Sequence, residues 1–486
     1  MSPSAAPQPS NKWLALALLA TAQFVIVLDA SIVNVALPSI GKDLDFSQDD
    51  LSWVVNAYTL IFGGFLLLGG RLADLLGRRR LFMSGLILFA LASLAGGLAQ
   101  SELWLIIARS VQGLGAALVS PAALSIVTTT FSEGAERNKA LGVWGAVADS
   151  GGAAGVLLGG VLTKYAGWEW VLFVNTPIGL AAAFIAPRLL GESRDERERT
   201  FDVAGAVSVT AGLALFVYTL VNANQAGWGS TETLALGAVA IALLVAFVFI
   251  ELRAAHPLVP FSIFRLQTLR GSNIVALLIG MSLFSMFFFI SLYLQQILHY
   301  DALKAGFAYL PLAVSIIISA GVASQAVTRI GFKPTLITGM VLITVALLWF
   351  SQVSAPGGSY LSDVLFPSLL AAVGLGFAFV SVTIGAVAGT KPQDAGLASG
   401  LINTSQQVGG ALGLAILAAI ANAATDNSNA ASHLVALNDG FRIAFLVGAG
   451  FALAGAILAS VLIDSRDSRA AVEEAARGEA PAAVAA

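Results

Sequence analysis

The sequence predicts an all-α polytopic membrane protein, and three observations carry that prediction. Hydrophobic residues make up 57% of the chain and charged residues only 11%, whereas soluble domains carry about 25% charged residues. Apolar stretches recur along the chain, and many reach the roughly 20 residues that a helix needs to cross a bilayer. Basic residues are concentrated in every second connection between these stretches. Together these features indicate a bundle of membrane-spanning helices.

The apolar stretches predict fourteen spans. Ala20-Thr21-Ala22 fits a signal-peptide cleavage site, but the apolar run that starts at Trp13 continues to Leu37. This run is too long for the hydrophobic region of a signal peptide, so we expect a retained first span. The spans are expected at 13–37, 51–70, 81–100, 103–128, 140–163, 169–189, 202–222, 233–252, 271–296, 305–327, 333–353, 361–387, 397–421 and 441–463.

The basic residues predict the orientation of these spans. Only Lys42, Lys164, Lys304 and Arg442 fall in the odd-numbered connections, and Arg109 lies inside a span. All other Lys and Arg residues lie at the N-terminus, at the even-numbered connections or in the tail. Basic residues accumulate on the cytoplasmic side of a membrane. We therefore expect a multi-pass protein of a bacterial cell (inner) membrane with both termini in the cytoplasm.

Polar connections divide the chain into blocks. We expect a cytoplasmic N-terminus (1–12), an N-terminal six-helix bundle (13–190), a charged cytoplasmic linker (191–201), two additional transmembrane helices (202–253), a linker (254–270), a C-terminal six-helix bundle (271–463) and a disordered cytoplasmic tail (464–486). The mixed charges of 191–201 predict a solvated linker. Two six-helix halves around a midplane site are typical of secondary transporters.

Several classes of function are excluded by composition. The net charge of −3 does not indicate the basic surface that binds nucleic acid. The absence of cysteine excludes disulfides and thiolate metal sites. The three histidines are scattered near span ends, and no GxxxxGK[ST] sequence is present. We find no nucleophile–base signature, which leaves a membrane-embedded enzyme as a weak alternative. We therefore expect no cofactor and no metal, and we expect an ion gradient or a partner to supply the energy for any transport.

Residues 141–163 form an unusual glycine-rich span. Gly145, Gly152, Gly155 and Gly159, together with Ala148, recur at steps of three and four, and Gly151 adds a further small residue at a step of four. Such spacing places small residues on one helix face. In a membrane these residues let neighbouring backbones approach closely. We expect a smooth stripe along which this span slides.

Two charged residues are embedded in other spans. Asp29 lies about 24 Å from the inner end of the first span, and Arg109 lies about 9 Å from the outer end of the fourth. In a hydrocarbon core of about 30 Å these positions have similar depth. A lone charge there is costly, so we expect the two residues to pair, directly or through water. A purely structural ion pair is the alternative to a functional one.

Asp149 is a third embedded charge, about 13 Å from the inner end of the fifth span. No basic residue of the sequence reaches its expected depth. A low dielectric disfavours the charged form of an unpaired carboxylate, so Asp149 is suited to carry a proton or to neutralise a cationic substrate. A neutral acid that bonds to the first or fourth span is the alternative.

The loop after the second span carries the most specific pattern, Gly70-Arg71-Leu72-Ala73-Asp74-Leu75-Leu76-Gly77-Arg78-Arg79. A plain positive-inside loop is the simple interpretation. The pattern resembles the signature loop of the major facilitator superfamily at Gly70, Asp74, Gly77, Arg78 and Arg79, and in that family the loop is a conformational latch. Gly331-Phe332-Lys333 after the tenth span is a degenerate counterpart.

Other segments resemble the same superfamily in order along the chain. Residues 28–38 are similar to the first-span motif of its fourteen-span drug:proton antiporters, and 109–115 to its fourth-span arginine motif. Residues 141–163 are similar to the antiporter motif, and 396–410 to span 13 of the subfamily. Val156 departs from the usual proline, and Asp149 from a usual small neutral residue. The resemblance implies a major-facilitator fold of two six-helix bundles with two extra helices between them.

The resemblance further implies a monomer that exports amphipathic drugs or antibiotics in exchange for protons, and the embedded carboxylates favour cationic substrates. Export of a natural product, lipid or siderophore is the alternative, and uptake by proton symport is a weaker one. Membrane lipid is the surrounding partner. Polar and aromatic residues expected to line the cavity are Asn34, Asn56, Tyr58, Gln112, Asn175, Phe288, Tyr293, Gln296, Asn403 and Gln407.

Overall fold

The computed structural model describes residues 12–51, 53–131, 135–193, 202–254, 257, 259–390, 395–428, 430 and 432–476. Every regular element in these ranges is helical, which confirms the all-α prediction. Eleven of the described helices are long and apolar enough to cross a membrane. Three shorter apolar helical stretches, Trp53–Leu66, Ala154–Tyr165 and Ala204–Leu220, lie within the second, fifth and seventh predicted spans. Each of the fourteen predicted spans therefore falls on helical chain, the sixth on two consecutive helices.

The described chain forms two compact units. Unit 1 extends to Phe216 and includes Leu236–Phe261, and unit 2 consists of Val217–Ala235 and the chain from Ser262 onward. The boundary crosses the two additional helices, α9 (Val203–Ala226) and α10 (Thr231–Arg253), so each of these helices contributes to both units.

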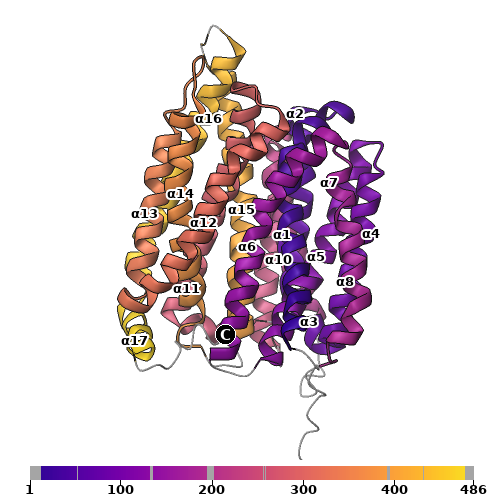
Figure 1. Ribbon diagram of the computed structural model, residues 1–486, viewed down its shortest axis with the longest axis vertical. Helices are drawn as coiled ribbons and strands as arrows, with labels where there is room; N and C mark the ends of the chain where they lie inside the picture. The colour runs from indigo at the N-terminus through magenta and orange to yellow at the C-terminus, as the bar shows by residue number, and fades with distance from the viewer. Residues whose placement is uncertain are drawn as a thin grey trace, which may run out of the picture. The chain divides into compact units, whose positions relative to one another are not determined.

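Unit 1 contains the first six predicted spans (Figure 1). Its elements are α1 (Lys12–Asp43), α2 (Gln48–Leu51), α3 (Trp53–Leu76), α4 (Arg78–Gly97), α5 (Glu102–Thr130), α6 (Ala135–Tyr165), α7 (Trp170–Phe173) and α8 (Asn175–Leu189). α1 packs along α6, and α5 packs against both α3 and α4. The sixth predicted span is divided at Val174 into α7 and α8. This division places Asn175 at the first position of a helix in the bundle.

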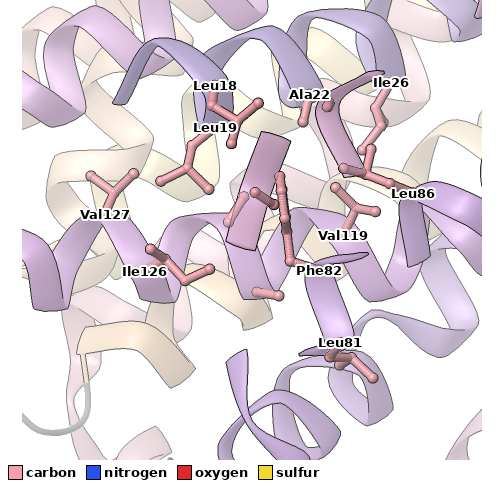
Figure 2. Packing of buried hydrophobic residues seen from close by; sticks show 14 of the residues in the cluster. Leu18, Leu19, Ala22, Ile26, Leu81, Phe82, Leu86, Val119, Ile126 and Val127 are labelled. Atoms are coloured by element: carbon pink, nitrogen blue, oxygen red, sulfur yellow. The ribbon is translucent and has the colours of Figure 1, made fainter. Parts of the chain in front are cut away.

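The apolar core of unit 1 lies between α1, α4 and α5. Figure 2 shows Leu18, Leu19, Ala22 and Ile26 of α1 facing the other two helices. The facing side chains are Leu81, Phe82, Leu86, Val119, Ile126 and Val127. In soluble domains, burial of apolar surface stabilises the fold by about 25 cal/mol per Å² removed from water. Between membrane helices, close packing takes that role. This packing fixes how α1 and α5 lie against each other where they carry Asp29 and Arg109.

Unit 2 contains the last six predicted spans and a short helix that follows them (Figure 1). Its elements are α11 (Gln267–Leu292), which ends in a π turn (Tyr293–Ile297), α12 (Ala302–Ile330), α13 (Phe332–Phe350), α14 (Phe366–Val387), which follows a π turn (Tyr360–Leu365), α15 (Ala395–Asp426), α16 (His433–Leu462) and α17 (Ser465–Ala476).

Helix α17 corrects the expectation of a disordered tail over 464–486. Its backbone is helical from Ser465 to Ala476, and it packs against α12 and α13. The composition of the tail is rich in Ala and Glu, and both are strong helix formers. A hydrogen bond from Thr268 Oγ1 to Asp467 Oδ2 further ties this helix to α11. Residues 477–486 lie outside the described part of the chain.

Candidate functional site

A buried ion pair joins α1 and α5 in unit 1. Arg109 Nη1 donates to Asp29 Oδ2 over 2.6 Å, and the side chains are 1% and 0% exposed. This geometry confirms the predicted pairing and shows that it is direct. The depth argument succeeded because both helices are regular, so the rise per residue places the two charges at one level.

Two amides complete the coordination of the Asp29 carboxylate. Gln112 Nε2 and Asn175 Nδ2 both donate to Asp29 Oδ1, over 2.8 and 2.7 Å. Gln112 Oε1 accepts from Arg109 Nη1 over 2.7 Å. Hydrogen bonds to an ionised group are roughly twice as strong as neutral ones. The carboxylate therefore accepts hydrogen bonds from side chains of α5 and α8, one of them from the guanidinium.

Ser93 of α4 orients both amides. Its Oγ accepts from Gln112 Nε2 over 3.0 Å and from Asn175 Nδ2 over 3.1 Å, and it donates to Leu172 O over 2.8 Å. Sequence reasoning missed Ser93, because one serine among small residues in an apolar span is equally typical of helix packing. The hydroxyl connects α4, α5 and α8 to the carboxylate of α1. We call Asp29, Arg109, Gln112, Asn175 and Ser93 the Asp29 network.

Helix α3 supports the arginine. Arg109 Nε donates to Val54 O over 3.0 Å, and the guanidinium carbon lies 4.3 Å from the centre of the Tyr58 ring. Tyr58 OH donates to Ile26 O over 3.4 Å. A Cβ at Gly113 would lie 2.5 Å from Tyr58 O, so only glycine allows α5 to approach α3 this closely. The glycine of the 109–115 motif thus has a packing role beside the ion pair.

The glycine stripe of α6 packs against α1 in the same unit. A Cβ at Gly151 would lie 2.5 Å from Phe24 O, one at Gly155 2.6 Å from Leu28 O, and one at Gly159 2.8 Å from Ile32 O. These contacts step by four residues on both helices, and Asp29 lies within the contacted part of α1. A Cβ at Gly152 would meet only Val27 Cγ1 at 3.9 Å. The stripe is therefore a close contact with the helix that carries Asp29, and its sliding stays a prediction.

Two predicted residues of this helix cannot be placed. Asp149 and Gly145 belong to the backbone of α6, but the side chain of Asp149 and the surroundings of Gly145 lie outside the described part of the structure. The role of Asp149 therefore stays a prediction.

The loop between α3 and α4 is anchored by the segment that follows α8. Gly77 has a φ of 106°, which L-residues rarely adopt, and a Cβ there would lie 2.6 Å from Glu192 Oε1. The Arg79 N–H donates to Glu192 Oε1 over 3.2 Å, and Arg79 Nη1 donates to Leu190 O over 3.1 Å. The Glu192 carboxylate also lies 3.7 Å from Nε of both Arg79 and Arg80.

Glu192 corrects the expectation of a linker solvated along its length. It lies at the positively charged N-terminus of α4, where an acidic side chain is stabilised. Sequence reasoning did not single it out, because it is one of seven mixed charges and its partners are more than a hundred residues away. The Arg78 N–H donates to Ser193 O over 3.0 Å, and Gly70 packs against Pro121 of α5. The side chain of Asp74 lies outside the described residues.

Unit 2 repeats this arrangement with different residues. Gly331 has a φ of 91° and precedes α13, as Gly77 precedes α4. Lys333 Nζ donates to Ile463 O over 2.7 Å and to Ser465 Oγ over 3.1 Å, and the Lys333 N–H donates to Ser468 Oγ over 3.1 Å. The start of α17 therefore contacts the α12–α13 loop as Glu192 contacts the α3–α4 loop in unit 1. The sequence of this loop is degenerate, but its anchoring is kept.

The remaining predicted cavity residues divide by environment. Asn56 is buried with no hydrogen bond to Oδ1 from the described residues, Asn34 Nδ2 donates to Ala30 O, and Phe288 packs edge-to-face on Phe289. Tyr293 OH bonds to Asp363 and Ser354 O, Gln296 and Gln407 are half-buried, and Asn403 is exposed. Of the ten residues, Tyr58, Gln112 and Asn175 gather around the ion pair.

An apolar groove of about 560 Å³ lies on α4 and α5 of unit 1. It is lined by apolar side chains that include Leu91, Leu103, Trp104 and Ile107. None of the predicted site residues borders it. In a membrane such a groove faces acyl chains, so it does not mark the site.

Comparison with known proteins identifies what the fold is similar to. Residues 19–414 match the family model described as Major Facilitator Superfamily. The solved structure of the human organic anion transporter MFSD10 (TETRAN) aligns with a TM-score of 0.63 at 16% identity, covering 93% of this chain and 100% of that one. At that identity the likeness supports the fold alone.

Two curated relatives are much more similar in sequence. The cephamycin export protein CmcT of Amycolatopsis lactamdurans is 41% identical over 460 residues, which is 93% of each chain. The puromycin resistance protein pur8 of Streptomyces alboniger is 38% identical over 473 residues, covering 96% of this chain and 93% of the relative.

Proposed function

Because the chain belongs to the major facilitator superfamily, whose members are membrane transporters, we propose that it exports amphipathic antibiotics or drugs in exchange for protons. The names of the relatives support export, since CmcT is an export protein and pur8 a resistance protein. Export of a natural product is the second candidate, and the name of CmcT favours it. We further propose an alternating-access cycle with both termini in the cytoplasm.

The observation that carries proton coupling is the Asp29–Arg109 pair. It is fully buried in a transporter bundle, and its carboxylate accepts from three donors. Buried ionisable residues in membrane spans typically serve ion or proton pathways. In this conformation the carboxylate is closed to a substrate, so we assign the proton to Asp29. Asp149 is then left as the carboxylate for a cationic substrate, and the two sites together give exchange.

The scheme is tested in proteoliposomes with a pH probe in the lumen. We expect a panel of cationic antibiotics to drive proton movement opposite to drug movement. Asp149→Asn should abolish uptake of cationic members of the panel, and the double variant Asp29→Asn/Arg109→Gln, which keeps the buried site neutral, should transport drug without moving protons. Full proton-coupled transport by the double variant would exclude Asp29 as the proton site. Transport of anionic members alone would exclude a cationic substrate.

The orientation has a separate test, because the chain contains no cysteine. Single cysteines introduced as Tyr165→Cys, which is 73% exposed, and Glu473→Cys in α17 can be labelled with an impermeant maleimide. In intact cells we expect labelling at position 165 and protection at position 473 until the membrane is opened. The reverse pattern would overturn the proposed topology.

A further inference from the structure

The side-chain amide of Asn175, beside the Asp29 carboxylate, uses its donor but not its acceptor. Its Nδ2 donates to Asp29 Oδ1 and to Ser93 Oγ, whereas its Oδ1 accepts no hydrogen bond from the described residues, and the side chain is fully buried. A buried polar atom without a partner costs free energy. Asn175 is also the first residue of α8. What distinguishes Asn175 from other buried amides is that its donor contacts a carboxylate while its acceptor is unused by the described residues.

The orientation of this amide follows from the charge of Asp29. An ionised carboxylate accepts hydrogen bonds only, so Nδ2 must face it and Oδ1 must face away. Ser93 fixes the same orientation, because its own proton is committed to Leu172 O and it offers the amide an acceptor. The observed arrangement is therefore the one suited to ionised Asp29.

Protonation of Asp29 reverses this requirement. When the carboxylate takes one proton from water it becomes a carboxylic acid, whose O–H is a donor. If Oδ1 carries that proton, it faces two amide N–H groups and has no acceptor. Rotation of the Asn175 amide by half a turn brings its Oδ1 to the carboxylic acid. This rotation breaks the two hydrogen bonds that Nδ2 donates to Asp29 Oδ1 and Ser93 Oγ. Ser93 then turns its hydroxyl from Leu172 O to the same Asn175 oxygen, so two hydrogen bonds to that oxygen replace the three of the ionised state.

We propose that Asn175 is a positioning residue for proton binding at Asp29: its amide donates to the ionised carboxylate and, turned over, accepts from the protonated acid. The inference rests on the proposed function, because it takes Asp29 as the proton site. Ser93 is the second member of this arrangement, and Gln112 stays a donor because its Oε1 is occupied by Arg109.

The charged groups that face Asp29 do not take over this role. Arg109 of α5 is permanently charged, and Tyr58 of α3 lies under its guanidinium. The helices that bring Ser93 and Asn175 carry their own charged residues, Arg80 and Arg188, about 20 Å further along each helix. α6 contributes Asp149, whose side chain is outside the described residues. Asn175 and Ser93 are thus the adjustable neutral groups that the structure shows at the carboxylate.

The first test measures proton binding at Asp29 in the full-length protein in lipid. Infrared titration follows the carbonyl band of the carboxylic acid that is absent from Asp29→Asn. We expect Asn175→Leu, which has neither donor nor acceptor, to raise the midpoint of this titration by about one pH unit, a tenfold change in proton affinity, because a charge-assisted bond is lost. Asn175→Thr should restore it, since a hydroxyl both donates and accepts.

Asn438 in α16 provides the matched control. It is equally buried, its Nδ2 donates to Val353 O over 3.0 Å and its Oδ1 accepts no bond from the described residues, but it contacts no carboxylate there. Asn438→Leu should leave the Asp29 midpoint unchanged. An unchanged midpoint in Asn175→Leu would overturn the inference while the proposed function stands. Absence of any Asp29 titration linked to transport would instead remove the proposed function.

A second measurement needs no substitution of Asn175. Protein grown with ¹³C-labelled asparagine side chains has an identifiable amide carbonyl band. We expect one such band to shift as Asp29 is protonated, and not to shift in Asp29→Asn, because the Asn175 carbonyl gains a hydrogen bond. Titration of Asp29 with no change in any labelled amide band would show that the amide stays in one orientation, and would refute the proposal.

Discussion

Lys333 in unit 2 makes the same backbone contact as Arg79 in unit 1. Each side chain donates to the carbonyl of the residue that directly follows the last helix of the sixth span of its unit: Arg79 to Leu190 after α8, and Lys333 to Ile463 after α16. A positive side chain is stabilised at this position by the partial negative charge of a helix C-terminus. The two loops therefore share one anchoring principle although only a glycine and a basic residue are common to them.

Replacement of Glu192 tests the anchor in unit 1. Glu192→Ala removes the bond to the Arg79 N–H and the contacts with two guanidinium groups. Since the carboxylate is 25% exposed, we expect a loss of only about 1 kcal/mol in the free energy of unfolding, seen as a lower melting temperature in detergent. Glu232→Ala, at an exposed bond to Asn222, is the control and should melt like the unchanged protein. Equal melting of the two variants would contradict the anchoring role.

Truncation after Asp464 tests the anchor in unit 2. It removes the bonds from Lys333 to Ser465 and Ser468 and the bond between Thr268 and Asp467. We expect faster hydrogen exchange at the start of α13, because the Lys333 N–H loses its acceptor, while exchange in the α3–α4 loop stays unchanged. Hydrogen-exchange mass spectrometry reads both loops in one experiment. Unchanged exchange at Lys333 would show that α17 is dispensable for this loop.

The buried ion pair predicts strong coupling between Asp29 and Arg109. Asp29→Asn leaves a buried, uncompensated guanidinium, and breaking such a pair costs about 3–5 kcal/mol. Arg109→Gln leaves a buried carboxylate with the same consequence. We expect the double variant to be more stable than the sum of the two single losses predicts, as measured by unfolding of each protein in the same detergent. Strictly additive losses would mean that the pair does not act as a unit.

The contact between α6 and α1 predicts a difference between two neighbouring glycines. A Cβ at Gly155 would overlap Ser31 Oγ and lie 2.6 Å from Leu28 O, whereas one at Gly152 finds space. Gly155→Ala should destabilise the protein by about 1–3 kcal/mol, the usual effect of overpacking, and lower transport. Gly152→Ala is the matched control and should have little effect, since alanine favours the helix. Similar melting temperatures for the two variants would argue against the described packing.

Much of the fold was predictable because membrane helices follow few rules. Span positions follow from length and hydrophobicity, and the pairing of Asp29 with Arg109 follows from helix rise and the cost of a lone charge in lipid. The partners of small and polar residues were not predictable. The stripe at Gly151, Gly155 and Gly159 shows a close approach but not which helix approaches, and Ser93 looks like any small residue. Glu192 and α17 act through contacts between segments far apart in the sequence.

The depth of the network sets how membrane voltage acts on it. Asp29 lies about 25 Å along α1 from Lys12, so in the proposed orientation only about a fifth of a 30 Å hydrocarbon core separates it from the outer surface. Moving one charge across the full potential is worth about 2.3 kcal/mol per 100 mV. A proton that reaches Asp29 from outside would thus gain only about 0.5 kcal/mol per 100 mV, and most of the electrical work would fall on the inward release step.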